Sequence, residues 1–413
     1  MILFPLTLLL LFTAALSAFG QEGLIPERRK PQFLSQGGYM VIPAPYSMPG
    51  IGEGMAIYGG VNNYIGYADF FGIHTMGDAE GTMVGLWDLH LIKEHLFVDL
   101  TRMEFQKVGF NSYASRGMGG GKDDFSVIET DRYRANMVDT VFSFYDRRLE
   151  VGMDFYEETF RPRRFLDPEG EVIQTISDPD EDYGNNYDYS ILIDLSDDRQ
   201  DPRRGVRGEL IFTPKPKNGP DDPEYYTTSI NLTGYLPLDG SDTWVFNYFH
   251  SDAHIQKKGE QDKAVLAEAY DCTYASCSQE VQNEIDNIYA HNTYGSARAL
   301  GGTDRLRAYP GNRFQGAHSR AVGTEVRFNF LEGRKPVNLF LIKDLRTSVQ
   351  LAFFHEIGTV ADEESQLWKR YRTSTGAGVR FVMGSGFVYR FDYAVGDEGG
   401  EMTIFVTYPW EEL

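Results

Sequence analysis

Short segments in which polar and apolar residues alternate recur along nearly the whole of this 413-residue chain. In the last of them, Met402 to Tyr408, every even position is apolar or aromatic, and two of the three odd positions are threonines. A period of two is typical of a β-strand with two unlike faces. Turn-like clusters such as PDEDYGNN and GDEGG separate the segments, as expected for strands joined by hairpins. The pattern therefore predicts an all-β chain.

The first twenty residues are typical of a secretory signal peptide. Ile2 to Phe12 is largely apolar, and Ala18 to Gly20 precedes Gln21 as a cleavage site would. No Lys or Arg stands near the start, unlike in most signal peptides, and a membrane anchor is the alternative. The apolar run is shorter than the ~20 residues of a spanning helix, which favours export and cleavage. We expect residues 1–20 to be the signal peptide, 21–38 a periplasmic lead-in and 39–413 the β-domain.

An exported β-chain with no further long apolar run is either a periplasmic or secreted β-protein or an outer-membrane barrel, whose strands carry an apolar outer face. The 25 Tyr and 28 Phe residues suit half-buried pleated surfaces. The net charge of −21 argues against nucleic-acid binding, which needs a cationic surface. The same charge is compatible with an acidic lumen or acidic outer loops. Strands of about ten residues, with short turns at one end and longer loops at the other, favour the barrel.

The candidate strands lie between Tyr39 and Trp410. Sixteen strands would give about 23 residues for each strand and its connection, although the periodicity alone also allows about 12, 14 or 18. The clearest segments are Thr82–Leu91, Leu96–Phe105, Tyr133–Tyr145, Leu149–Tyr156, Tyr187–Leu195, Gly208–Thr213, Tyr226–Leu236, Thr243–His254, Ser348–Gly358, Gly376–Met383, Gly386–Val395 and Met402–Tyr408.

The longest irregular stretch, Lys257 to Ser296, is predicted to be an extracellular loop with short helices at Val265–Ala269 and Glu280–Ile288. It contains the only two cysteines, Cys272 and Cys277. In an exported chain, two cysteines this close are expected to form a disulfide. Two free thiols are the alternative. A metal site would need more ligands, and the segment YDCTYASCSQE has no His.

Four segments, in this order, resemble the BamA/TamA outer-membrane barrel superfamily, also called the bacterial surface antigen family. The family patterns are D-x-R-D-x-x-x-P-x-x-G, [VIL]-R-G-[FY], F-x-D-x-G, and S-x-G-x-G-[LVI]-R followed by [LVI]-R-x-D-[YF]-A. Ala308 stands where the family favours glycine, and Glu356 stands where aspartate is usual. The matching segments are YSILIDLSDDRQDPRRGVRGELIF (189–212), LGGTDRLRAY (300–309), LAFFHEIGTV (351–360) and YRTSTGAGVRFVMGSGFVYRFDYAVG (371–396).

The resemblance implies an antiparallel transmembrane β-barrel, with sixteen strands as the favoured count, and an extracellular loop folded into the lumen. In the family, an arginine of this loop reaches an acidic partner on the barrel wall, which corresponds to Arg307 and Glu356 here. Leu306, Tyr309 and Gly358 would belong to the same contact, whose role is structural. A solvated position for Arg307 is the alternative.

By resemblance, the chain would assist insertion or translocation of proteins at the outer membrane of a Gram-negative-type bacterium. Its partners would be outer-membrane lipids, client outer-membrane proteins and periplasmic or membrane proteins. Ile42 to Gly60 resembles the opening strand of short family members, which lack the periplasmic POTRA domains. A weakly paired seam is expected between a first strand within Met55–Asn63 and the last strand, marked by Gly59, Gly60, Ile404 and Val406. A lipid or small-solute conduit and a non-catalytic scaffold are the alternatives.

The sequence predicts no enzyme, cofactor or metal site. RGMGGGKDD (116–124) lacks the Ser or Thr that follows the lysine of a phosphate-binding loop. The eight His residues show no zinc-ligand spacing. His318 beside Ser319 lacks the nucleophile elbow of a hydrolase. The end of the chain also departs from the usual barrel signal, because Glu411, Glu412 and Leu413 follow Trp410.

Overall fold

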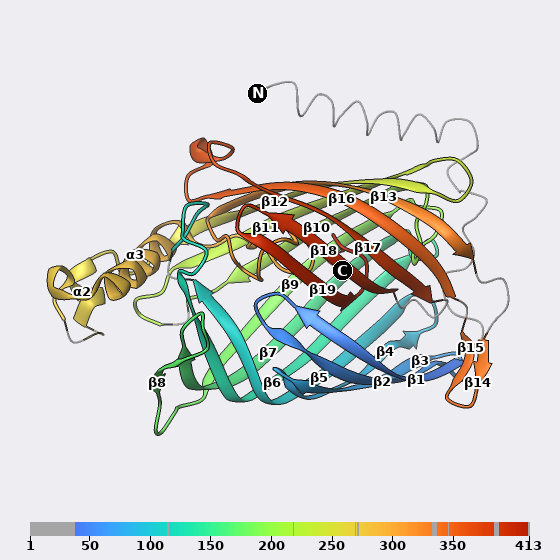
Figure 1. Ribbon diagram of the computed structural model, residues 1–413, viewed down its shortest axis with the longest axis horizontal. Coiled ribbons are helices and arrows are strands. Elements are labelled where there is room, and N and C mark those ends of the chain that lie inside the picture. Colours follow the sequence, from blue (N-terminus) through green and yellow to red (C-terminus); the bar gives the residue numbers. More distant parts are fainter. Residues whose placement is uncertain are drawn as a thin grey trace.

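The computed structural model describes residues 38–113, 115–217, 219–268, 270, 272–332, 337–345, 347–383 and 388–411. Sixteen strands form one closed antiparallel wall, in which each strand pairs with the next and the last returns to the first (Figure 1). The predicted all-β transmembrane barrel and its strand count are confirmed. The predicted signal peptide and lead-in lie outside the described residues, apart from Gly38, which begins the first strand.

The wall strands differ in length. Those of one side, β5 to β7, have 18, 20 and 18 residues, whereas β18 and β19 have 9 and 8. In chain order the wall is made of β1 (Gly38–Met48), β2 (Gly52–Tyr64), β3 (Ala68–Gly77), β4 (Glu80–Ile92), β5 (Leu96–Tyr113), β6 (Phe125–Phe144), β7 (Leu149–Leu166), β9 (Asp182–Asp194), β10 (Gly205–Lys215), β11 (Glu224–Pro237), β12 (Thr243–Lys257), β13 (His318–Glu332), β16 (Thr347–Ala361), β17 (Arg372–Met383), β18 (Val388–Gly396) and β19 (Gly399–Val406).

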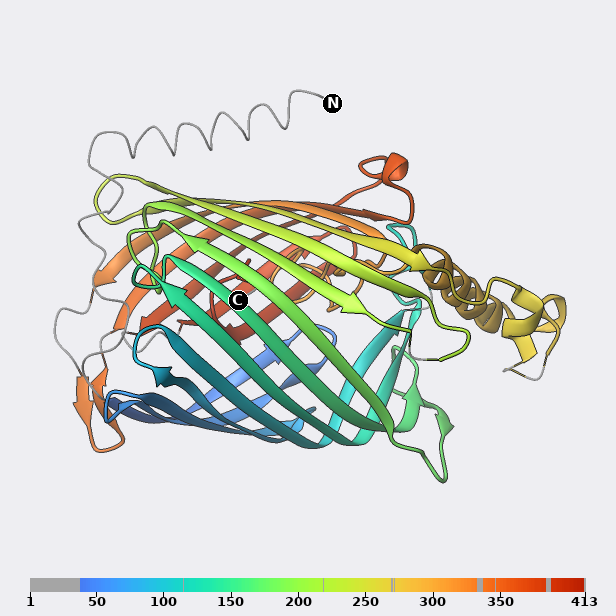
Figure 2. The same ribbon diagram turned by 180° about the vertical axis from the view of Figure 1, so that it is seen from behind.

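Three short strands lie outside this wall. β8 (Val172–Thr175) pairs with the end of β7. β14 (Val337–Leu339) and β15 (Ile342–Leu345) form a hairpin whose second strand pairs with the start of β1. The hairpin and β8 lie at opposite ends of the barrel (Figures 1 and 2). We call the end with β14 and β15 the turn end, and the other the loop end.

A helical arm projects from the loop end (Figures 1 and 2). It contains α2 (Lys263–Glu268), a short 3-10 turn η2 (Tyr274–Ser276) and α3 (Gln279–Tyr294), close to the two predicted helices. Ser278 caps the start of α3 by accepting a hydrogen bond from Val281, and Gly295, with φ of 76°, ends it. Cys272 and Cys277 are joined by a disulfide. A second 3-10 turn, η3 (Glu364–Gln366), follows β16.

None of the described helices is long and apolar enough to cross a membrane.

The period-two pattern places one set of side chains inside the barrel and the other on its outer surface. On β12, Val245 and Phe249 are buried, and Phe249 lies under the guanidinium of Arg305 from a loop inside the lumen. The preceding residue, Trp244, is exposed on the outer surface. On β13 and β16 to β18, buried charges stand among the apolar groups at the inner positions. The wall therefore has a lipid-type outer face and, on this side, a charged lumen.

Candidate functional site

The segment from Gly295 to Ala317 folds into the lumen as a closed loop, which we call the inward loop. Leu300 and Phe314 pair at its base through two backbone hydrogen bonds of 2.9 and 3.0 Å. Gly301 has φ of 105°, and a Cβ there would lie 2.2 Å from the carbonyl oxygen of Pro310. Only glycine fits at such a position. The glycine-rich start of this segment thus allows its tight closure.

Arg307 is fully buried at the tip of the inward loop. Its backbone N–H and its Nε donate to the two carboxylate oxygens of Glu356, each at 3.0 Å. Its Nη1 donates to Asp392 at 2.7 Å, and the guanidinium also reaches Glu325 at 3.3 Å. The guanidinium lies 3.4 Å from the ring centre of Phe354. Such charge-assisted contacts from three strands fix the loop against the wall.

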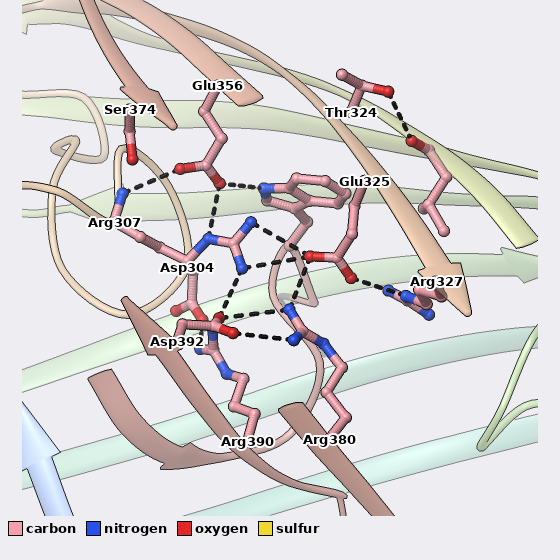
Figure 3. A network of polar contacts seen from close by, with 12 residues as sticks. Asp304, Arg307, Thr324, Glu325, Arg327, Glu356, Ser374, Arg380, Arg390 and Asp392 are labelled. Atoms are coloured by element: carbon pink, nitrogen blue, oxygen red, sulfur yellow. Dashed lines mark hydrogen bonds and ion pairs between the residues drawn. The ribbon is translucent and has the colours of Figure 1, made fainter. Parts of the chain in front are cut away.

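Three more buried arginines complete the network (Figure 3). Arg380 bridges Glu325 at 2.7 Å and Asp392 at 2.9 Å. Arg327 donates to Glu325 at 2.8 Å, and Arg390 donates to Asp392 at 3.1 Å and to Asp304 at 3.2 Å. Four arginines therefore face four carboxylates, with Glu356 as the fourth. This balance lets charges remain ionised away from bulk water.

The structure brings together all five residues predicted for the loop–wall contact. Leu306 has φ of 51° and lies against Gly358, where a Cβ would come within 3.0 Å of the leucine side chain. The Tyr309 hydroxyl donates to the carbonyl oxygen of Thr373 at 3.1 Å. Ala308 is accommodated because its backbone needs no left-handed conformation. Arg380, Arg390 and Asp392 are the Arg and Asp residues of the fourth motif, but no role in the contact was predicted for them.

The tail after β19 also turns into the lumen, a position that the strand periodicity does not predict. Thr407 and Trp410 have φ of 75° and 68°, so the chain leaves the strand direction there. The buried indole of Trp410 donates to Glu356 at 2.9 Å. The Tyr408 hydroxyl bonds to Asp201 and Gln350, and Arg207 contacts Glu411 at 2.8 Å. The tail thus shares Glu356 with the inward loop.

The glycine-rich stretch at 117–121 packs on the inward loop at the loop end. Gly117 donates a backbone hydrogen bond to Gln315, and the Met118 sulfur accepts one from Val360. Arg116 binds Asp362 at 2.5 Å, and Arg313 binds Glu398 at 2.8 Å and the carbonyl oxygens of 120 and 121. Through these contacts the stretch covers the inward loop at the loop end, and we call it the cover.

A cavity of about 1040 Å³ lies between the inward loop and the inner faces of β5 to β11. Carboxylates of Asp99, Asp139, Asp154 and Asp188 line its wall side, and Arg298 and Arg305 reach it from the inward loop. Charges of both signs therefore border the open part of the lumen.

The wall closes on itself through one weak junction, between β1 and β19. Their only registered pair among the described residues is Ser47 with Ile404, and the Ser47 hydroxyl donates to the carbonyl oxygen of Met402 at 2.9 Å. By contrast, β1 pairs with β2 over its whole length, from Gly38 with Asn62 to Met48 with Gly52. We call the β1–β19 junction the seam.

The predicted position of the seam is wrong on the β1 side. The segment Met55–Asn63 lies within β2, where Gly59 pairs with Val41 of β1 and with Gly72 of β3. Gly60 is likewise paired on both sides. Ile404 lies at the seam, whereas Val406 pairs with Tyr389 of β18.

The edge of β1 that faces the seam lacks hydrogen-bond donors at two positions. The N–H of Val41 donates to Leu341, on the side away from β2. Alternate residues of a strand direct their backbone groups to the same side, so positions 43 and 45 face the seam too. Both are proline, which has no N–H. The Pro45 carbonyl accepts a hydrogen bond from the Tyr389 hydroxyl.

The two residues behind the hydrolase alternative point to opposite faces of β13. Ser319 is buried on the lumen side, whereas His318 lies on the outer face and contacts Asp252 at 2.7 Å. They cannot act as a nucleophile and its base in this arrangement.

Comparisons with known proteins give a match to one family model and to solved structures. The Omp85 superfamily domain matches residues 103–403, more than half of the chain. A search of curated proteins gives no match. BamA from Haemophilus ducreyi lacking POTRA domains 1–3 is 13% identical, with a TM-score of 0.44, over 90% of this chain and 69% of that chain.

Two CdiB structures also match. CdiB from Escherichia coli is 10% identical, with a TM-score of 0.43, and CdiB from Acinetobacter baumannii is 10% identical, with a TM-score of 0.47. Each comparison covers 90% of this chain, but only 62% and 60% of the CdiB chains. This chain thus spans less than two thirds of either CdiB chain.

Proposed function

The chain belongs to the Omp85 superfamily, and on this basis we propose that it assists the insertion or translocation of proteins at the bacterial outer membrane. The family membership confirms the resemblance found in the four sequence motifs. The proposed role needs no catalytic group and no cofactor. It needs a wall that opens laterally, because a client strand must pass from the lumen or the periplasm into the bilayer.

The weak seam is the observation that supports this role. β19 is the shortest wall strand, and Ile404 is its only residue with a registered partner on β1 among the described residues. An unpaired strand edge is a template for another strand. Opening the seam would therefore break few backbone hydrogen bonds. The short strands β18 and β19 beside it would also favour local thinning of the bilayer.

The client strand is expected to add to β19. The prolines at 43 and 45 remove two donors from the facing edge of β1, and prolines at an edge prevent regular strand pairing. On β19, the edge from Gly399 to Thr403 has no registered partner on the seam side among the described residues. The edge of β19 is therefore the better template for a client strand, because its backbone donors are not removed by proline.

A disulfide across the seam tests the proposal. The variant Ser47→Cys/Ile404→Cys joins residues that face each other. In liposomes, oxidation should abolish the barrel's acceleration of folding of an unfolded test barrel protein, and a reductant should restore it. The matched control is Met153→Cys/Tyr189→Cys, which joins the continuously paired β7 and β9 and should remain active. Full activity with a closed seam would refute the proposal.

A conduit for small solutes is the second candidate function. The charged cavity beside the inward loop supports it, because its volume of about 1040 Å³ is in the range of small-molecule sites. The cover at the loop end argues for a gated passage rather than an open pore.

A further inference from the structure

The strands next to the seam carry apolar residues on both faces. Along β1 to β5, the residues Ile42, Tyr58, Ile73, Met83 and Met103 pair in register as one row across the wall. Met103 has the same parity as Asp99, which lines the cavity, so the row faces the lumen. All five side chains remain partly exposed.

The outer face of the same strands is apolar too, with Val41, Ile57 and Val84 each at least 40% exposed. A barrel wall normally alternates apolar outside and polar inside. An apolar lumen wall is thus not needed for membrane insertion. A contiguous exposed apolar surface with a polar rim is typical of a ligand-binding groove.

The apolar row continues into the charged cavity at β4 and β5. Phe71 and Trp87 pack with ring centres 4.2 Å apart. Trp87 is 44% exposed and donates from its indole to Thr101 at 3.0 Å. Asp99, two residues before Thr101, receives a hydrogen bond from the backbone of Asp88 at 2.6 Å and lines the cavity. The apolar row on the inner face of β1 to β5 is therefore continuous with the charged cavity.

Carboxylates on four neighbouring strands form a row in this pocket. Asp99 pairs in register with Asp139, Asp139 with Asp154, and Asp154 with Asp188. Asp188 binds Arg298 at 3.0 Å. The carboxylates of Asp139 and Asp154 have no hydrogen bond or ion pair with another residue among those described. Two adjacent carboxylates in a partly enclosed site favour a cation, and Arg298 beside them offers a partner for an anion.

The seam gives the membrane access to this path. β1, whose inner face starts the apolar row, is also the strand whose seam edge carries two prolines and has a single registered pair with β19. A ligand with an apolar chain could therefore pass from the bilayer onto the inner face without crossing a paired strand.

We propose that the lumen binds a zwitterionic phospholipid of the adjoining membrane, with an acyl chain along the inner face of β1 to β5. Its amino headgroup lies at Asp139 and Asp154, and its phosphate lies near Arg298. This site goes beyond the proposed function, because it requires no client protein. A phospholipid suits both parts of this surface. Its acyl chain suits the apolar row, and its amine and phosphate suit the carboxylates and the arginine of the pocket.

Photo-crosslinking tests this site. A photoreactive amino acid replaces Ile73 on the lumen face or, as the matched control, His74 on the outer face of the same strand. The barrel is reconstituted in vesicles of phosphatidylethanolamine or of phosphatidylglycerol. We expect lipid adducts at position 73 with phosphatidylethanolamine. In Asp139→Asn/Asp154→Asn they should fall about tenfold, roughly the effect of one lost charge-assisted hydrogen bond. They should also fall in phosphatidylglycerol, whereas adducts at position 74 should stay unchanged.

Two outcomes would overturn the proposal. The first is no lipid adduct at position 73 while position 74 gives one. The second is an adduct at position 73 whose yield changes neither with the headgroup nor with the Asp139→Asn/Asp154→Asn change. Such a result would indicate an unspecific apolar surface. Folding of the test barrel protein should be unaffected by the Asp139→Asn/Asp154→Asn change, so the proposed function stands or falls separately.

Discussion

Arg307 holds the inward loop in place through carboxylates on three wall strands. Arg307→Met keeps much of the side-chain volume but leaves Glu356 without its arginine and takes from Asp392 one of its three arginines. Removing one partner of a buried ionic network costs about 3–5 kcal/mol. We expect a correspondingly lower denaturant midpoint for the barrel in detergent, followed by its heat-modifiable gel mobility.

The matched control for this variant is Arg102→Met on β5. Arg102 is 3.6 Å from Glu104, and both side chains are largely exposed. An exposed pair of this kind contributes about 0–1 kcal/mol. Equal midpoints for the two variants would show that Arg307 does not stabilise the barrel.

At this scale the sequence predicts contacts that belong to a local motif. Arg307 and Gly358 match the family motifs, Glu356 takes the place of the family aspartate, and the structure places the three together. Trp410 has no such letter: it binds Glu356 only because two left-handed residues turn the tail inward. Periodicity reports which face of a strand a residue occupies, but it gives no information on a chain that has left the strand.

At the scale of the elements, the tail ties the last strand to the lumen. Trp410 fills the space over Gly323, where a Cβ would lie 2.5 Å from the indole. Trp410→Ala removes this packing and the hydrogen bond to Glu356, and a buried Trp→Ala change costs about 3–5 kcal/mol. In the Ser47→Cys/Ile404→Cys background, we expect slower disulfide formation, because β19 loses its anchor beside the seam.

Glu411→Ala is the control for the tail. It removes one contact to Arg207 from a partly exposed side chain and should leave the rate of seam oxidation nearly unchanged. If Trp410→Ala oxidises as fast as Glu411→Ala, the tail does not position β19.

The strand elements show where the alternation pattern fails. The stretch Ile42 to Gly60 was expected to be one opening strand, but it is β1, a turn at Pro49–Ile51, and β2. Both faces of β1 are apolar, so the period of two is hidden there. The dipeptide Pro49-Gly50 is a turn signal that divides the stretch. This turn signal, and not the periodicity, marks the boundary between β1 and β2 and hence places the seam at β1.

At the scale of the whole molecule, the barrel has two closures. The weak seam closes its wall, and the cover closes its loop end. Arg116 holds the cover through Asp362, Ser296 and the carbonyl oxygen of Gly295. Below it lies the charged cavity. Lateral opening through the seam and axial opening through the cover are therefore separate motions, made by different residues.

Arg116→Ala separates them experimentally. The variant removes the contacts that Arg116 makes and so loosens the cover, but it leaves the seam and the Arg307 network intact. In planar bilayers we expect small, flickering conductance for the parent protein. The variant should conduct several times more, because the cover contributes the loop-end closure through charge-assisted bonds. The control is Arg132→Ala on β6, which removes an exposed ion pair with Glu181. This variant should conduct like the parent. If Arg116→Ala also conducts like the parent, the inward loop alone closes the lumen, and a gated solute passage at the loop end is refuted.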